Sequence, residues 1–188
     1  MYRSLFKRFI DIVFSFLTAV FFAPIYIIVA LIIYLQDFNN PIFKQKRIGL
    51  NQKEFTIFKF RSMPINTANV PSSNFNKITI TPFGKFIRRT NLDELPQLFN
   101  IFIGDMSIIG PRPSLVSQTD LIQLRRKYNV YTCKPGLTGL AQVNGFDNLP
   151  NATKAKWDGE YANDISFIKD TIIVLRTLAY LTKKPPIY

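Results

Sequence analysis

The stretch TNLDELPQLFN, residues 90–100, places two acidic residues, Asp93 and Glu94, side by side just before a proline and an apolar run. An ionised aspartate can act as a nucleophile toward phosphorus and form an acyl phosphate. The same stretch also fits a helix start, in which Asn91 caps the first turn and Glu94 reaches back three residues later. Taken alone, the pair favours the capping interpretation, because such boxes are common at helix starts.

The two interpretations are compatible. The positive end of a helix dipole favours the ionised form of a nearby carboxylate, so we expect Asp93 to stay unprotonated at neutral pH. Pro96 belongs in the first turn of the expected helix, and the cap could therefore be displaced by a residue or two.

Basic residues bracket the acid pair. Lys85, Arg88 and Arg89 precede it, and Arg112 follows within the turn GPRP, residues 110–113. Arginine presents a planar fork that suits phosphate oxygens, and a turn stiffened by proline holds that fork at low entropic cost. Each arginine alone is typical of a solvated surface charge, but together these cations indicate a site for an anionic group.

A glycine-rich stretch, KPGLTGLAQVNG at residues 134–145, is the second candidate for binding. Its backbone N–H groups and the side-chain amides of Gln142 and Asn144 could bind a sugar or a nucleotide. Neither the P-loop pattern nor G-x-G-x-x-G occurs in the chain, so ATP-type phosphoryl transfer and dinucleotide binding have no support.

Composition limits the chemistry further. The 188 residues contain no histidine, which removes the usual acid–base catalyst and the commonest metal ligand. The single cysteine, Cys133, excludes an internal disulfide and indicates a buried, inert thiol. Twenty-four Lys and Arg against 12 acids give a net charge of +12, which implies an anionic partner: nucleic acid, anionic lipid or a phosphorylated substrate.

Residues 12–35 carry no charge and are long enough, as a helix, to cross a bilayer core of about 30 Å. Pro24 lies at the middle of this run and should bend the helix. Basic residues flank the run on both sides, namely Arg3, Lys7 and Arg8 before it and Lys44, Lys46 and Arg47 after it. Basic flanks on both sides favour a re-entrant helix-break-helix that enters and leaves on the cytoplasmic face, with a kinked span as an equal alternative.

The remainder, residues 37–188, reads as one soluble domain that follows the apolar segment within residues 1–36. We expect a β-hairpin with strands over 42–48 and 54–60, and a polar surface loop over 62–82. Helices are expected over 83–89, 92–103, 115–128 and 152–163. The fold class is therefore α+β, predominantly helical, with a short β-hairpin.

The last helix, residues 166–184, is amphipathic. It places Phe167, Ile172, Leu175 and Leu178 on one face and basic residues elsewhere. This face could cover the core of the domain, or the segment could lie in the membrane interface as an interfacial amphipathic helix.

Five features occur in a fixed order: an apolar segment with a central proline, FKFRSM, LDELPQLFN, GDMSIIGPRPSLV and KPGLTGLAQVNG. In this combination the chain resembles the small monotopic bacterial phosphoglycosyl transferases, the PglC-like family of polyprenyl-phosphate sugar-phosphate transferases. The resemblance implies transfer of a sugar phosphate from a UDP-sugar to undecaprenyl phosphate at the cytoplasmic face of the inner membrane. The products would be undecaprenyl-diphospho-sugar and UMP, with Mg²⁺ as cofactor. The resemblance also makes residues 37–188 a cytoplasmic catalytic domain packed on the membrane, after a membrane hairpin over residues 1–36.

By position, the resemblance makes Asp93 the nucleophile that forms a phosphosugar-aspartyl intermediate. It makes Glu94 the partner of Asp93 at the metal or in proton handling. It also puts Lys59, Arg88 and Arg112 near the substrate phosphates, and it puts Pro24 at the break of a re-entrant membrane hairpin.

Two residues depart from the family pattern. Ala23 stands where the family often has serine before the hairpin proline, and Phe146 stands where it often has arginine after QVNG. The second departure leaves the choice of sugar open, and an N-acetylated or bacillosamine-type sugar is only a guess. The pathway and the oligomeric state, including a homo-oligomer, are open as well.

Two other functions compete with sugar-phosphate transfer. A membrane-tethered binding protein could use the basic surface to hold nucleic acid or anionic lipid. An acidic pair among the cations would repel a polynucleotide, however, and no nucleic-acid motif occurs, so we expect no nucleic-acid partner. A UDP-sugar hydrolase would use the same acids but would need no lipid acceptor.

Overall fold

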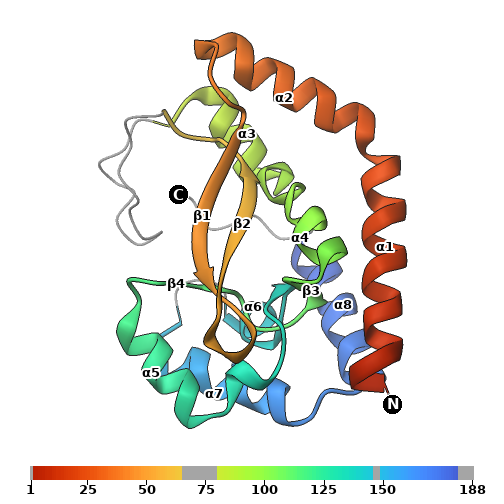
Figure 1. Cartoon of the computed structure of the whole chain (residues 1–188), viewed down its shortest axis with the longest axis vertical. Helices are drawn as coiled ribbons and strands as arrows, with labels where there is room; N and C mark the ends of the chain where they lie inside the picture. The colour runs from red at the N-terminus through yellow and green to blue at the C-terminus, as the bar shows by residue number, and fades with distance from the viewer. Residues whose placement is uncertain (1, 65–79, 146–148, 182–188) are drawn as a thin grey trace.

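Two helices that meet at a bend open the chain. In the computed structural model, which describes residues 2–64, 80–145 and 149–181, α1 (Lys7–Phe21) follows a π-helical turn (Tyr2–Phe6). The next helix, α2 (Ala23–Asp37), leaves α1 at a bend of 63° (Figure 1). Pro24 lies in the first turn of α2, where its missing N–H costs no helical hydrogen bond. The predicted helix-break-helix at Pro24 is confirmed.

The membrane prediction concerns this pair. Among the described residues no single helix has the length and apolar character needed to cross a bilayer, whereas α1 and α2 together meet both criteria. Large apolar side chains lie exposed along both helices, with Phe9 65% and Phe21 78% exposed on α1 and Ile27 69% exposed on α2. Whether the pair enters a membrane, and whether it re-enters or spans, stays a prediction.

The predicted hairpin is confirmed, with both of its strand boundaries. Strand β1 (Ile42–Ile48) pairs antiparallel with β2 (Glu54–Phe60), so that Ile42 faces Phe60. A short strand that was not predicted, β4 (Ser114–Leu115), pairs with the other edge of β1 and gives the order β2-β1-β4. This pairing brings the GPRP turn, which directly precedes β4, to the hairpin.

A second small sheet was also missed. It joins β3 (Ser107–Ile109) and β5 (Gly136–Thr138) in parallel. The two backbone segments approach so closely that a Cβ on Gly136 would lie 2.1 Å from the backbone nitrogen of Gly110. Strands of three residues are too short to show an alternating pattern, which is why the sequence did not predict them.

The helices of the domain follow the prediction with three corrections, the first of which is a helix over residues 140–145, where the sequence indicated only a glycine-rich turn. They are α3 (Pro82–Arg89), α4 (Gln97–Ile103), α5 (Thr119–Lys127), α6 (Leu140–Gly145), α7 (Asn151–Asn163) and α8 (Phe167–Leu181). The single helix predicted over 92–103 is wrong: a 3₁₀ turn, Leu92–Glu94, is followed by Leu95 and Pro96 before α4 begins. Proline has no N–H to continue the hydrogen-bond ladder, so the helix starts afresh. Helix α5 begins later than predicted because Ser114 and Leu115 join the sheet.

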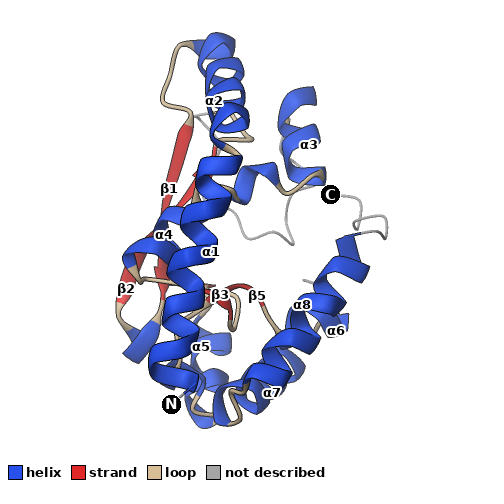
Figure 2. Cartoon of the chain, turned by 90° about the vertical axis from the view of Figure 1, so that its right-hand side faces the viewer, coloured by secondary structure: helices blue, strands red, loops and turns tan. Residues whose placement is uncertain are grey.

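Three apolar clusters hold these elements together. The first packs α4 on β2 through Leu98, Ile101 and Ile57. The second packs α2 against β2 and α3 through Val29, Ile33, Phe60 and Ile87. The third joins β3, α6, α7 and α8 through Ile109, Leu140, Tyr161 and Ile173. Helix α4 lies alongside α1 in both views (Figure 1, Figure 2), so the first helices are part of the fold rather than appended to it.

Helix α8 resolves the alternatives left open for its apolar face. Phe167, Ile168, Leu175 and Leu178 are 59%, 72%, 61% and 56% exposed, whereas Ile173 is buried. The predicted apolar face therefore does not cover the core, and its contact with a membrane stays a prediction. The expected mostly helical α+β class is confirmed, the division at residue 37 stays a prediction, and the core of the expected polar loop, residues 65–79, lies outside the described residues.

Candidate active site

The acid pair lies in the 3₁₀ turn between α3 and α4, and the predicted capping box is not formed. Asn91 has a left-handed backbone (φ 55°), and its side chain makes no capping hydrogen bond. The carboxylate of Glu94 does not reach back to Asn91 but accepts from two cations instead. The turn is only three residues long, so it offers no extended helix whose amides a cap would need to satisfy.

Glu94 is held between two elements that are far apart in the sequence. Lys59 Nζ, from β2, lies 2.6 Å from Glu94 Oε1, and Arg112 Nη2, from the GPRP turn, lies 3.0 Å from the same oxygen. Burial opposes ionisation, but the charges of Arg112 and Lys59 and their hydrogen bonds outweigh it and hold the pKa of Glu94 well below its usual range. Glu94 is therefore a permanent anion that fixes two cations in place.

Asp93 is in a different environment, although it is the next residue. Its side chain is nearly covered, at 8% exposure, and it makes no ion pair among the described residues. Burial raises its pKa to about 6, while Lys59, Arg88 and Arg112 lower it and Glu94 raises it further. The expectation that a helix dipole would favour ionisation was wrong in direction, because burial outweighs the effect of so short a turn. The carboxylate is still largely ionised above pH 7.

Apolar packing fixes the backbone of this turn against α2. Leu92 and Leu95 pack against the cluster that contains Val29 and Ile33 of α2. The hydroxyl of Tyr26, also in α2, donates to the carbonyl oxygen of Leu95. The acid pair is therefore attached directly to the apolar helix pair at the start of the chain.

Asn100 sets the register between α4 and β2. Its Oδ1 accepts from the backbone N–H of Phe58 at 3.0 Å, and its Nδ2 donates to the carbonyl of Thr56 at 2.8 Å. Asn100 is completely buried, so these bonds satisfy polar groups that water cannot reach. They fix the position of the β2 segment next to Lys59 relative to α4, which follows the acid pair.

The GPRP turn is held by hydrogen bonds to its backbone. Arg125 Nη1 donates to the carbonyl of Arg112 at 2.8 Å, and Arg47 Nη1 donates to the carbonyl of Pro113 at 3.0 Å. The N–H of Gly136 donates to the carbonyl of Pro111 at 2.9 Å. Hydrogen bonds to three successive carbonyls restrict the backbone of the turn. The side chain of Arg112 is therefore attached to a backbone that is held in place.

Behind Arg112 lies a buried ion pair that the sequence did not predict. Arg125 and Asp158, on α5 and α7, are 4% and 1% exposed in their side chains, and Arg125 Nη2 lies 2.6 Å from Asp158 Oδ2. Both residues lie on predicted helices, where single charges are typical of solvated faces. No sequence pattern distinguished them, because their partners come from separate helices.

The other predicted site residues are distributed unevenly. Arg88 lies in the last turn of α3 and acts electrostatically on Asp93, whereas Lys85 and Arg89 of the same helix are exposed. Gln142 and Asn144 lie on α6, where Gln142 donates to the carbonyl of Leu137 and Asn144 donates to the carbonyl of Leu140. No contact in the described part of the chain joins these two amides to the acid pair. Phe146 lies outside the described residues.

The side chains of the acid pair supply only some of the ligands that a magnesium ion needs. The described residues contain no group of three or more metal-ligating side chains. Magnesium in phosphoryl-transfer sites, however, is held by one or two carboxylates together with the substrate phosphates. Asp93 and Glu94 supply two adjacent carboxylates, so the residues present fit such an ion once a diphosphate completes the coordination.

The arrangement can bind and attack a phosphate group. A buried carboxylate that titrates near pH 6 stands next to cations that can neutralise phosphate oxygens. Gln97, one turn further on, is 2% exposed, and its amide nitrogen finds no hydrogen-bond partner among the described residues. This donor was not singled out from the sequence, and its orphaned nitrogen is the kind of group that a bound ligand satisfies.

Comparison with known proteins finds bacterial sugar transferases. The sequence pattern of the bacterial sugar transferases matches residues 2–184. The chain is 42% identical to a UDP-glucose:undecaprenyl-phosphate glucose-1-phosphate transferase of Klebsiella pneumoniae, over 89% of this chain and 37% of that protein. It is 36% identical to a protein of the same name from Caulobacter vibrioides, over 93% of this chain and 69% of that protein.

A third relative carries a different sugar in its name. The chain is 31% identical to a UDP-galactose-lipid carrier transferase of Erwinia amylovora, over 86% of this chain and 37% of that protein. The chain thus spans 37% of the length of the Klebsiella and Erwinia relatives.

Proposed function

The chain belongs to the bacterial sugar transferase family, and we propose that it transfers a sugar 1-phosphate from a UDP-sugar to undecaprenyl phosphate, giving undecaprenyl-diphospho-sugar and UMP. The observation that carries this proposal is the acid pair itself. A buried Asp93 with a pKa of about 6 lies among cations and is attached to the exposed apolar helix pair. Such a site suits a reaction between a charged diphosphate and a lipid-borne phosphate.

In the first step a carboxylate oxygen of Asp93 attacks the β-phosphorus of the UDP-sugar. A bond forms between that oxygen and phosphorus while the bond to the bridging oxygen breaks, and UMP leaves with the electron pair. The cations Lys59, Arg88 and Arg112 offset the charge that builds up when one anion approaches another. The product is a phosphosugar-aspartyl intermediate.

In the second step an oxygen of undecaprenyl phosphate attacks the same phosphorus. The acyl-phosphate bond breaks, and the carboxylate of Asp93 is released as the anion with which it began. Neither step transfers a proton, because both nucleophiles are already ionised near neutral pH. A chain without histidine therefore lacks nothing that this chemistry needs.

Glu94 has a supporting role in this proposal. Because it stays ionised, it holds Lys59 and Arg112 beside the reacting phosphates before the substrate arrives. When bound by Asp93 and Glu94, Mg²⁺ would supply charge neutralisation on the diphosphate and make UMP a better leaving group. Chelation of the metal is therefore expected to stop UMP release.

The location follows from the same reasoning. A lipid acceptor requires the site to lie at a membrane surface, and the substrate UDP-sugar is a cytoplasmic metabolite. We place the site at the cytoplasmic face of the inner membrane, with α1 and α2 as a re-entrant anchor. The names of the relatives make UDP-glucose and UDP-galactose the first donors to test, ahead of the N-acetylated sugars.

The test is UMP release by the protein in nanodiscs, with a panel of UDP-sugars, Mg²⁺ and undecaprenyl phosphate. We expect at least one UDP-sugar to give UMP in amounts that depend on the lipid acceptor, and we expect Asp93→Asn to abolish this release. The control is Asp164→Asn, because the Asp164 side chain is 75% exposed and pairs with Lys169 rather than with the cations around Asp93. Undiminished UMP from Asp93→Asn would refute the nucleophile.

The competing functions give different results in the same assay. Catalytic UMP release without lipid would identify a UDP-sugar hydrolase. Absence of UMP with every donor, with retained binding of anionic lipid, would identify a membrane-tethered binding protein.

A further inference from the structure

A cationic cavity lies at the end of α4 opposite to the acid pair, next to the first turns of α1. Its volume is about 190 Å³. The charged side chains that line it are Arg3, Lys7, Arg8, Asp11 and Lys134. A single buried water needs only about 10–15 Å³ on this measure, so the space is ample for a hydrated phosphate group. Nothing in the proposed reaction uses these residues.

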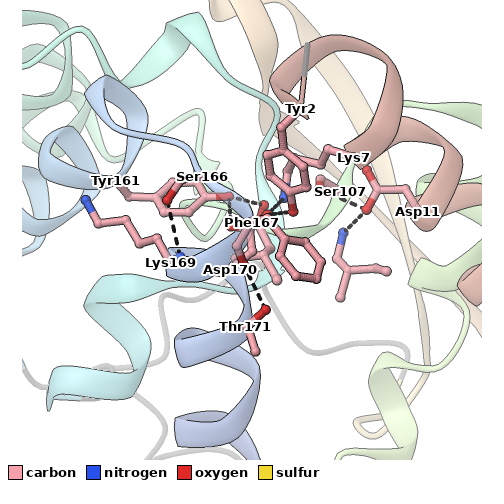
Figure 3. A network of polar contacts seen from close by, with 12 residues as sticks. Tyr2, Lys7, Asp11, Ser107, Tyr161, Ser166, Phe167, Lys169, Asp170 and Thr171 are labelled. Atoms are coloured by element: carbon pink, nitrogen blue, oxygen red, sulfur yellow. Dashed lines mark hydrogen bonds and ion pairs between the residues drawn. The ribbon is translucent and has the colours of Figure 1, made fainter.

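A network of hydrogen bonds fixes the walls of this cavity (Figure 3). Asp170 of α8 accepts from Tyr2 Oη at 2.6 Å, from Lys7 Nζ at 2.7 Å and from Tyr161 Oη at 2.8 Å. Asp170 is 3% exposed, so it acts as a buried hub that ties the start of α1 to α7 and α8. The cavity is therefore part of the folded core and not a gap beside a loose terminus.

The second acid of the region is also fully engaged. Asp11 accepts from Ser107 Oγ at 3.1 Å and from the backbone N–H of Ile108 at 2.9 Å, and it is 3% exposed. These bonds join α1 to β3 (Figure 3). The carboxylate of Asp11 is thus turned toward the sheet, and no cation forms an ion pair with it among the described residues.

The remaining cations of the cavity meet neutral partners. Arg8 Nη2 donates to the carbonyl of Phe102 at 2.7 Å, at the C-terminal end of α4. Arg3 Nη2 donates to the carbonyl of Thr132 at 2.8 Å. Lys134 forms no ion pair and no hydrogen bond through its ammonium in the part of the chain that the structure describes. Four lining cations therefore face one lining carboxylate, and Asp170 behind the wall compensates only Lys7.

Two of these cations converge on one point. A Cβ placed on Gly104, which ends α4, would lie 3.2 Å from Arg8 Nη2 and 3.3 Å from Lys134 Nζ. Burial and then the charge of Arg8 lower the pKa of Lys134, against the attraction of Asp11 and Asp105. Like charges gathered in a partly buried space cost free energy unless an anion lies between them.

Exposed apolar side chains lie close in the sequence to the cations of the cavity or contact residues of its network. Leu5, Phe6 and Phe9, in the same turns as Arg3 and Arg8, are 71%, 58% and 65% exposed. Phe102, whose carbonyl accepts from Arg8, is 44% exposed, and Phe167, whose ring packs at 5.7 Å on Tyr2, is 59% exposed. Exposed apolar side chains in the same segments as a group of cations match a phosphate that is carried by a lipid, whose acyl chains these side chains can contact.

We propose that this cavity binds a phosphate group through Arg3, Arg8 and Lys134, and that a membrane phospholipid headgroup supplies it. The bound phosphate would tie the start of α1 to the lipid surface. This proposal goes beyond the transfer reaction and does not depend on it, since it involves neither Asp93 nor Glu94.

The test measures how fast an amine-reactive acylating reagent modifies Lys134, by peptide mass spectrometry. The protein is held in dodecyl maltoside micelles, which carry no phosphate, with or without added phosphatidylglycerol, and separately with or without inorganic phosphate. A phosphate group beside Lys134 protonates and shields its amine, so we expect modification to slow about tenfold or more. Rates are normalised to Lys127, an exposed lysine on α5, to remove the effect of surface potential on the reagent.

Protection of Lys134 by phosphatidylglycerol supports the proposal with a lipid as the source. Protection by inorganic phosphate alone supports the phosphate site and identifies a soluble source. A Lys134 rate that changes with neither probe overturns the proposal.

Two variants sharpen the result. Arg3→Gln should raise the concentration of the protecting probe needed for half protection by about tenfold, because it removes one charged donor. The matched control is Arg126→Gln, an exposed arginine that contacts Gln52 away from the cavity. In Asp93→Asn the protection of Lys134 should be unchanged, so the outcome is separable from that of the transfer reaction.

Discussion

Replacement of Asp93 by asparagine should make the folded protein more stable above pH 6, although it removes the proposed nucleophile. Burial raises the pKa of Asp93 from 3.8 to about 6, even with Lys59, Arg88 and Arg112 nearby. Each pKa unit corresponds to about 1.4 kcal/mol, so ionisation of Asp93 costs the folded state about 3 kcal/mol. Asparagine has nearly the same shape and carries no charge, so the variant avoids this cost.

The raised pKa of Asp93 determines how the stability effect of Asp93→Asn changes with pH. The folded protein holds the proton of Asp93 more tightly than the unfolded chain does, so this carboxyl favours folding most below about pH 4. That contribution is lost as the pH rises through about 6. The stability gain of Asp93→Asn should therefore be near zero at pH 4 and reach about 3 kcal/mol at pH 7.5.

The assay is thermal unfolding in detergent at pH 4, 5, 6 and 7.5. For a domain of this size, about 3 kcal/mol corresponds to a rise in Tm of roughly 6 to 12 °C at the highest pH. Asp164→Asn serves as the control and should leave Tm nearly unchanged, because that carboxylate is largely exposed. A lower Tm for Asp93→Asn at pH 7.5, or a difference that does not vary with pH, would refute the argument that the ionised carboxylate is strained by burial.

Three further predictions concern Arg112, the buried ion pair behind it, and the membrane topology of α1 and α2. Arg112→Met should lower kcat for UMP release by roughly 10²- to 10³-fold with a smaller effect on folding, as measured by initial rates and Tm, because it removes a charged donor at the phosphates. Asp158→Asn should destabilise the fold by about 3–5 kcal/mol by leaving Arg125 buried without its charge partner, and the double variant Arg125→Met with Asp158→Leu should recover much of that loss in the same unfolding assay. Cysteines introduced at Tyr2 and Asn40 should both be shielded from an impermeant periplasmic label if α1 and α2 form a re-entrant anchor; labelling of one of them alone would mean a span.

The sequence predicted the elements whose patterns are local. The hairpin strands alternate over seven residues each, and the break at Pro24 follows from a missing backbone donor. The basic residues around the acid pair in the sequence suggested Arg112, and the family resemblance suggested Lys59; both contact Glu94.

Features that depend on distant partners were missed. The parallel pairing of β3 with β5 joins segments that are 29 residues apart and has no local pattern. Arg125 and Asp158 resemble surface charges until α5 and α7 pack together. The pKa of Asp93 depends on how deeply the turn is buried against α2, which no motif reports.

The central claim is that Asp93 forms a covalent bond to the sugar phosphate. The direct measurement is a single turnover with a UDP-sugar that the protein accepts, with Mg²⁺ and without undecaprenyl phosphate, followed by quenching and peptide mass spectrometry. Our account predicts about one UMP released per protein molecule and a sugar-phosphate mass added to Asp93, which disappears when undecaprenyl phosphate is supplied before the quench. Stoichiometric UMP with no adduct on any peptide, or an adduct on a residue other than Asp93, would contradict it.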